Sequence, residues 1–350
     1  MRKIIILLAF MISLTLAGKV EGQSILQQYF NGNKDSLLTE AARLINMPAP
    51  TFKPVKQAAI DPTVLTDLGF EQDYKTEDHF FITRDNKKIF SYKFPKASQN
   101  TILLLHGVGS TAWLQNKAAG LLQEATQAEI FAIDFRGHGQ SEGKAGDVDY
   151  INQYADDLSD IIETVKKGKP NGKIFIAAHS MGGGVTLRYA MANHQQKIDG
   201  FLLFAPLIGH NSPAIRKVQA AGSDSTEPFM KIHFTRIIGL KMLNEINHHE
   251  QDSLPVLFFN LPETMPLRQY SYRANISMAP DNYTDGLKSV KVPMLVLIGD
   301  HDEVFAADKL KKAVIDNSKG KVYIIQGASH NGIRHNAQAY KLIQNWFLNL

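Results

Sequence analysis

The sequence predicts an α/β fold with a mostly parallel central sheet, helices on both faces and a helical cap inserted after the sixth strand. Short, unbroken apolar runs alternate with segments of helical periodicity, which is typical of strands covered on both faces of a parallel sheet. This alternation stops once, between about residues 207 and 290, and then resumes. The interruption indicates an insertion into a single α/β unit.

The strands and helices are expected to follow one another in βα units joined by right-handed crossovers. A hairpin is predicted over 79–94, where two β-branched and aromatic runs flank the turn Asp85-Asn86. The apolar runs that follow it are 101–106, 129–135, 173–179, 200–206, 293–299 and 321–327. Periodicity of about 3.6 residues predicts helices over 154–165, 182–192 and 339–348.

The insertion is rich in Met, Phe, Ile and His, and only VLFFNL (256–261) in it could form a buried strand. Because it follows the carboxyl end of a strand, we expect a mostly helical cap over the edge where ligands bind in open α/β sheets. Its segment 229–246 is apolar on one side and carries Lys231, Arg236 and Lys241. Such a segment either packs on the core, or contacts a membrane surface and admits an acyl chain.

The first residues have the pattern of a secretory signal peptide. A positive start is followed by an apolar run of about fifteen residues and by small residues near Ala17 and Gly18. An uncleaved membrane anchor is the alternative, but the run is short for a span, which needs about 20 residues. The absence of cysteine excludes disulfides and thiolate metal sites. An exported chain of this kind fits a bacterial protein that is periplasmic or secreted.

The composition is that of an ordinary globular protein, with 44% hydrophobic and 21% charged residues among 350. The net charge of +4 is not gathered into a dense basic tract, which argues against a nucleic-acid partner. The expected organisation is a signal peptide (1–22), an N-terminal arm (23–75) with a helix near 36–45, the core in two parts (76–206 and 291–350), and the cap between them (207–290).

The strongest signal for chemistry is Ser180, which lies in the run AHSMG between the strand 173–179 and a helix. A serine on a sharp strand-to-helix turn is held in a strained conformation that exposes its hydroxyl group. So tight a turn requires small residues two positions before and after the serine, and Ala178 and Gly182 meet this requirement. We therefore predict that Ser180 is a nucleophile rather than a helix N-cap.

A serine nucleophile needs a base, and the base needs an orienting carboxylate, in the chain order Ser, acid, His. The last two strands run into GDHDEV and GASHNGI, and Asp302 and His330 each lie three residues past the glycine of their run. Both follow the carboxyl end of a strand, as Ser180 does. We predict Asp302 as the acid and His330 as the base. Their rivals are Asp300 and Glu303 for the acid and His335 for the base.

Two backbone N–H groups are expected to stabilise the oxyanion. That of Met181 follows the nucleophile directly, and a second should come from the loop after the first parallel strand, HGVGS (106–110). Val108 is the candidate for this second donor, and its side chain is not used. His106 is expected to hydrogen-bond nearby loop backbone.

A further polar cluster, DFRGHGQS (134–141), follows the strand 129–135. We interpret it as an ordered structural loop beside the site, because its glycines do not lie in a phosphate-binding frame. His248 and His249 lack partners at metal-ligand spacing, and His301 among acids is expected to lie in an exposed loop. No metal and no cofactor are predicted.

The runs HGVGS, DFRGHGQSEG, AHSMGGG, GDHDEV and GASHNGI, in this order, resemble the α/β-hydrolase superfamily. Their combination is similar to its branch of lysophospholipases and monoacylglycerol lipases, which includes S33-type serine aminopeptidases. The resemblance covers about residue 76 to the end. It implies Ser180, Asp302 and His330 as a catalytic triad, with Val108 and Met181 as the oxyanion donors. Ala178 departs from the usual glycine without affecting the triad.

The expected function is that of a serine hydrolase that cleaves carboxylic esters through an acyl-enzyme. The resemblance implies monoacyl lipids as substrates, and the cap suggests peripheral membrane contact. An S33-type aminopeptidase is the alternative, in which acids of the cap would hold a free amine: Glu227, Glu245, Glu250 and Asp252. A non-catalytic binding protein of the same fold is a third hypothesis, against which the full set of catalytic groups argues.

Overall fold

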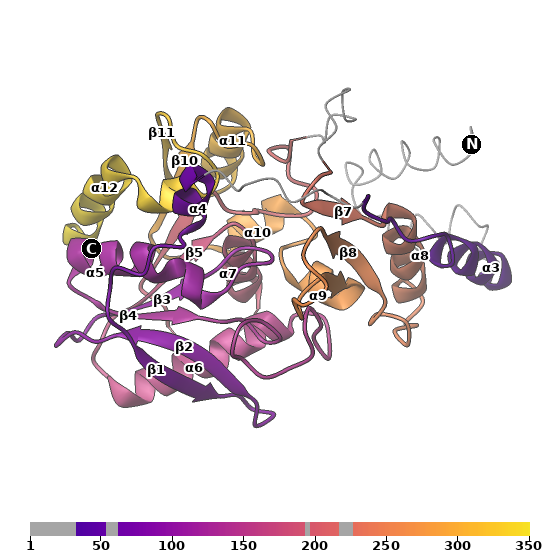
Figure 1. Ribbon diagram of the computed structural model, residues 1–350, viewed down its shortest axis with the longest axis horizontal. Helices are drawn as coiled ribbons and strands as arrows, with labels where there is room; N and C mark the ends of the chain where they lie inside the picture. Colours follow the sequence, from indigo (N-terminus) through magenta and orange to yellow (C-terminus); the bar gives the residue numbers. More distant parts are fainter. Residues whose placement is uncertain (1–32, 54–61, 193–196, 217–226) are drawn as a thin grey trace.

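The computed structural model describes residues 33–53, 62–192, 197–216 and 227–350 (Figure 1). The predicted signal peptide lies outside these residues. No helix among the described residues has the length and apolarity that a membrane span needs. The bounds of the predicted domains stay predictions.

The core is an eight-stranded sheet in the order β1-β2-β4-β3-β5-β6-β10-β11. The strands β3 to β6, β10 and β11 run parallel, whereas β1 and β2 form the predicted hairpin and β2 is antiparallel to β4. All the predicted core strands are confirmed, with the bounds β1 Glu77–Ile82, β2 Lys88–Phe94, β3 Thr101–Leu105, β4 Glu129–Ile133, β5 Ile174–His179, β6 Gly200–Phe204, β10 Met294–Gly299 and β11 Lys321–Ile325.

Helices cover both faces of this sheet, because the crossover direction differs on the two sides of β3. The helices α5 and α12 pack together, while α6, α7, α10 and α11 form a second contiguous group. The three helices predicted from periodicity are present as α6, α7 and α12. The bounds are α5 Asn116–Thr126, α6 Gln153–Gly168, α7 Met181–Met191, α10 Tyr283–Ser289, α11 Ala307–Asn317 and α12 Ala337–Leu348.

Burial explains the apolar runs, with one exception. Every residue of β3, β4, β5, β6 and β10 is buried, as the unbroken runs predict. Strand β11 is mostly half-buried or exposed, and Tyr323 faces solvent, because this strand forms the edge of the sheet. An apolar run alone does not distinguish a central strand from an edge strand.

The described part of the insertion between β6 and β10 holds the helices α8, α9 and α10, and also a small sheet that was not predicted. It contains a three-stranded antiparallel sheet, β7-β8-β9, and the run VLFFNL supplies the middle strand. The strands are too short to show a clear period in the sequence. Their bounds are β7 Met230–Ile232, β8 Pro255–Phe259 and β9 Gln269–Ser271, with helices α8 Phe234–Asn244 and α9 Tyr272–Ser277.

The N-terminal arm lies against this cap insertion. Its helix α3 (Lys34–Ile45), predicted near 36–45, packs beside α8, and Gly239 allows the close approach to the backbone of α3 (Figure 1). Lys231 donates to the carbonyl oxygen of Thr51, and Arg236 donates to that of Ile45. Two of the three cations of the segment 229–246 therefore bind the arm. A second arm helix, α4 (Pro62–Leu68), lies near the carboxyl-terminal loops of the core.

Candidate active site

Ser180 stands between β5 and α7 in the conformation expected of a nucleophile on a tight turn. Its φ is +51° and its ψ −114°, outside the regions that a residue other than glycine normally adopts. The surrounding fold holds this conformation, because the Ser180 N–H donates to Phe204 and its carbonyl oxygen accepts from the N–H of Leu207. A Cβ atom at Gly182 would lie 2.9 Å from the carbonyl oxygen of His106, so the turn leaves no room for a side chain there.

Asp302 and His330 form a buried pair. Nδ1 of His330 lies 2.9 Å from Oδ2 of Asp302, and the Asp302 side chain has no solvent exposure. Oδ1 of the same carboxylate accepts the N–H groups of Val304 and Phe305, at 2.8 and 2.7 Å. Because the carboxylate accepts from Nδ1–H, the neutral imidazole leaves Nε2 unprotonated and able to take a proton.

The rival residues serve other contacts. Asp300 accepts the N–H of Gly327 at 2.7 Å, and Glu303 accepts the N–H of His330 at 3.0 Å. His335 lies in a separate environment, where burial lowers its pKa to about 3. Among these acids, only Asp302 pairs with the His330 ring in the described part of the chain. The catalytic roles of Asp302 and His330 stay predictions.

His179 is a residue of the site that sequence reasoning missed. Its Nε2–H donates to the carbonyl oxygen of His330 at 2.9 Å, and the two rings lie 4.8 Å apart. Burial lowers the pKa of His179 well below its usual range, so the ring is a neutral donor. The contact ties the residue before Ser180 to the backbone of the candidate base. Its only sequence signal was a polar side chain at the end of a buried strand.

The N-terminal arm also touches the loop of the candidate base. The hydroxyl group of Ser329 donates to Asp67 Oδ2 at 2.5 Å, and Arg334 donates to the carbonyl oxygens of Asp67 and Leu68. No catalytic pattern is visible in the arm sequence, and none of these contacts could be inferred from it. The end of α4 therefore supports the His330 loop from outside the core.

The two predicted oxyanion donors lie past the carboxyl ends of neighbouring strands, Val108 in the loop after β3 and Met181 as the first residue of α7. Within the described ranges, neither the N–H of Val108 nor that of Met181 meets an acceptor. Gly107, beside Val108, lies against Ser180, since an added Cβ would be 3.3 Å from the serine Cβ. His106 hydrogen-bonds loop backbone as predicted, because its ring contacts the Gly107 carbonyl oxygen and the Phe135 N–H.

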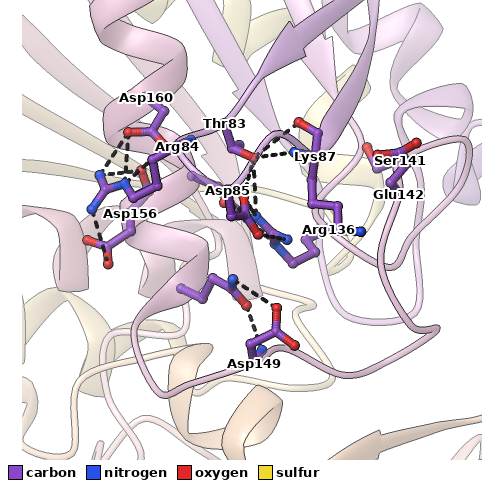
Figure 2. Close-up of polar contacts among 12 residues, drawn as sticks. Thr83, Arg84, Asp85, Lys87, Arg136, Ser141, Glu142, Asp149, Asp156 and Asp160 are labelled. Atoms are coloured by element: carbon purple, nitrogen blue, oxygen red, sulfur yellow. Dashed lines mark hydrogen bonds and ion pairs between the residues drawn. The ribbon is translucent and has the colours of Figure 1, made fainter.

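The loop 134–141 has the predicted structural role. Arg136 is almost fully buried and forms ion pairs with Asp157 at 2.6 Å and with Asp85 at 2.7 Å. Figure 2 shows Arg136 reaching the hairpin turn at Asp85, next to a separate, more exposed pair between Arg84 and Asp160. These contacts fix the loop to the hairpin and to α6. No set of three His, Cys, Asp or Glu side chains that could hold a metal ion occurs among the described residues.

Comparisons with known proteins identify the family of this chain. Residues 96–335 match the family described as "Serine aminopeptidase, S33". The rat monoglyceride lipase is 35% identical over 129 residues, which are 36% of this chain and 41% of the lipase. The match thus spans about two fifths of the length of that relative.

Solved structures share the fold at low sequence identity. The esterase Pf2001 of Pyrococcus furiosus superimposes with a TM-score of 0.53 at 19% identity, over 86% of this chain and 98% of the esterase. The monoacylglycerol lipase of Paleococcus ferrophilus gives 0.50 at 21% identity, over 75% and 98%. Since the family match covers more than half of the sequence, the chain belongs to the serine aminopeptidase S33 family of α/β-hydrolases, in the branch similar to monoglyceride lipases.

Proposed function

We propose that this protein is a serine hydrolase that cleaves the carboxylic ester bond of monoacyl lipids. The observation that carries the proposal is the buried Asp302–His330 pair at the edge of the sheet where Ser180 is held in its strained conformation. In this arrangement His330 Nε2 takes the proton as the oxygen of Ser180 attacks the ester carbonyl. The alcohol then leaves with that proton, and water hydrolyses the acyl-enzyme.

The tetrahedral intermediates carry a negative charge on the former carbonyl oxygen. We assign its stabilisation to the N–H groups of Val108 and Met181, which have no acceptor in the described part of the protein. Preorganised donors of this kind typically contribute about 3–4 kcal/mol each to transition-state stabilisation.

Exposed apolar side chains around these groups support a lipid substrate. Phe229 of the cap is 51% exposed, and its ring lies against Gly109, next to Val108. On the side of Asp302, Ile215 and Val304 are also exposed, and Ile215 is bridged to Phe305. Apolar surface beside polar catalytic groups favours a substrate with an acyl chain. Contact of the cap with a membrane surface and export from the cell remain proposals.

The test is an ester panel on wild type and Ser180→Ala, with p-nitrophenyl acetate, octanoate and laurate, followed by monolauroylglycerol and lauroyl-lysophosphatidylcholine. We expect higher kcat/KM for the longer chains, and loss of all these activities in Ser180→Ala. Phe229→Ala should lower the preference for long chains, whereas Phe80→Ala, an exposed phenylalanine on β1, should not. Equal or faster turnover of the acetate ester would contradict the lipid assignment.

An aminopeptidase is the second candidate, favoured by the description of the matching family. Its site would need an acid free to hold the substrate amine. Glu227 is paired with Lys231, and Asp252 accepts from Asn244. Glu245 and Glu250 are exposed on the cap. Hydrolysis of aminoacyl-p-nitroanilides, absent with the N-acetylated compounds, would favour this candidate over the esterase.

A further inference from the structure

A tyrosine of the cap reaches into the loop that carries the candidate oxyanion donor. Tyr270 lies in strand β9 of the insertion, and its side chain is fully buried. Its hydroxyl oxygen lies 2.9 Å from the backbone nitrogen of Gly109 and 2.5 Å from Nε2 of His138. Gly109 follows Val108 directly. One hydroxyl group therefore joins the cap, the oxyanion loop and the loop 134–141.

The direction of each hydrogen bond in this chain is determined by its ends. Nδ1 of His138 lies 2.9 Å from the carbonyl oxygen of Arg136, which can only accept, so Nδ1 carries the proton. Burial lowers the pKa of His138 to about 4, so that the ring is neutral near pH 7 and Nε2 is an acceptor. The Tyr270 hydroxyl therefore donates to His138 and accepts the N–H of Gly109.

The strand that carries Tyr270 is itself fixed to the core. The N–H of Ser271 donates to the carbonyl oxygen of Gly146 at 2.9 Å. Two residues further on, Arg273 makes a two-pronged ion pair with Asp147, at 2.8 and 2.9 Å. Asp147 is buried, and bidentate pairs of this geometry are among the stronger ones. The core therefore holds both the strand that carries Tyr270 and the hydroxyl group at the end of its side chain.

The oxyanion loop needs such an external support. Gly109 has a φ of +64°. The ring of Phe229 lies beside it, but this side chain is 51% exposed and gives the loop little support. A glycine-rich loop has many accessible conformations, so the direction of the Val108 N–H depends on what holds the next peptide group. Gly109 N–H is held by Tyr270 and by no other described residue.

We propose that Tyr270 is a positioning residue of the esterase site, which holds Gly109 so that the N–H of Val108 faces the oxyanion. The inference rests on the proposed function and adds a role for the cap, which then completes the oxyanion site as well as bordering the substrate. His138 supports Tyr270 by accepting its proton. A phenyl ring would fill the same space but could not accept the N–H of Gly109.

The test is Tyr270→Phe, measured for kcat and KM with a p-nitrophenyl ester and for inhibition by an alkyl trifluoromethyl ketone. The ketone adds to the serine and places an oxyanion in the site, so its Ki reports on oxyanion binding. We expect kcat to fall about tenfold and Ki to rise about tenfold, less than the loss for removal of a donor, because the donor is misaligned rather than removed. KM should change by less than about twofold.

The matched control is Tyr154→Phe, which removes a buried hydroxyl group from the same aromatic cluster. The Tyr154 hydroxyl has no partner among the described residues, and its ring lies 6.2 Å from that of His138. This variant should keep the wild-type kcat and Ki. If Tyr270→Phe is folded by circular dichroism and keeps kcat and Ki within about twofold of wild type, the inference is overturned.

Two substitutions of His138 extend the test in case Tyr270→Phe does not fold. His138→Gln keeps an acceptor for the hydroxyl proton, whereas His138→Leu has a similar volume and no acceptor. We expect the Leu variant to lose more kcat than the Gln variant, with KM again little changed. Equal kcat in the two folded variants would overturn the inference. Ser180→Ala, measured in parallel, distinguishes failure of this inference from failure of the proposed function, since retained activity in Ser180→Ala would contradict the proposed function whatever the Tyr270 variant does.

Discussion

The core side of the candidate site and the cap-and-arm side hold their polar groups in different ways. On the core side, Ser180, Asp302 and His330 follow the ends of strands in one sheet, so hydrogen-bonded registers bring them together. On the other side, the contacts are single side chains from distant segments, such as Tyr270 to Gly109 and Asp67 to Ser329. The sheet therefore sets the positions of the candidate catalytic groups, whereas side chains of the insertion and the arm support the loops that align them.

The largest effect is expected from Asp302→Asn, which keeps the shape of the acid. An amide can present its N–H₂ group to the His330 ring and favour the tautomer with the proton on Nε2, which cannot act as a base. We expect kcat to fall by on the order of 10⁴-fold. Asp300→Asn is the matched control, because Asp300 accepts from Gly327 and does not touch His330, and kcat should stay near wild type. A larger loss in Asp300→Asn than in Asp302→Asn would reverse the assignment.

The second prediction concerns stability on the core side. Arg136→Met leaves the carboxylate of Asp157 buried without its partner, and we expect a loss of about 3–5 kcal/mol in the free energy of unfolding by urea. Arg84→Met breaks the ion pair with Asp160 beside it, but the Arg84 side chain is 51% exposed, so the loss should be at most about 1 kcal/mol (Figure 2). Similar losses in both variants would show that burial does not set the cost.

The third prediction is a dependence of stability on pH. Burial lowers the pKa of His138 to about 4, below its usual 6.5, so the unfolded chain binds a proton before the folded protein does. This residue therefore contributes stability above pH 6.5 that is lost as the pH falls toward 4, by about 3 kcal/mol. Burial raises the pKa of Asp134 and Asp157 to about 6, which has the opposite sign in this window.

The comparison of variants isolates the contribution of His138. His138→Gln should be less stable than wild type at pH 7, but its free energy of unfolding should fall less between pH 7 and pH 4. Urea denaturation at three pH values measures both slopes. Parallel slopes for the two proteins would mean that His138 titrates normally in the folded state.

The smallest effect is expected on the cap-and-arm side. Lys231 donates to Thr51, and its ammonium group lies 4.9 Å from the centre of the Phe52 ring. Because Lys231 is half-exposed, Lys231→Met should cost about 1 kcal/mol or less, seen as a small fall in Tm. Lys241→Met, in the cap helix α8 and without a side-chain hydrogen bond or ion pair among the described residues, should leave Tm unchanged. A large loss of stability in Lys231→Met would mean that the arm and cap are more tightly coupled than these contacts imply.

The sheet and the candidate catalytic residues could be predicted because their signals are local. Ser180 lies in a short motif at a strand-to-helix junction, and Asp302 and His330 lie just past apolar runs. The short strands of the cap gave almost no periodic signal, so its small sheet was not predicted. The supporting residues could not be found, because Gly109 and Tyr270 lie 161 positions apart, and Asp67 and Ser329 lie 262 apart. Such pairs follow only from the folded chain.

The most direct test of the central claim is the labelling of Ser180 by a fluorophosphonate probe. The probe reacts with a serine only when a base and oxyanion donors activate its hydroxyl group. We predict that one label is incorporated into the wild-type protein, that peptide mapping locates it on Ser180, and that Ser180→Ala and His330→Ala are not labelled. A label on another residue, or equal labelling of Ser180→Ala, would contradict the assignment of Ser180 as the nucleophile.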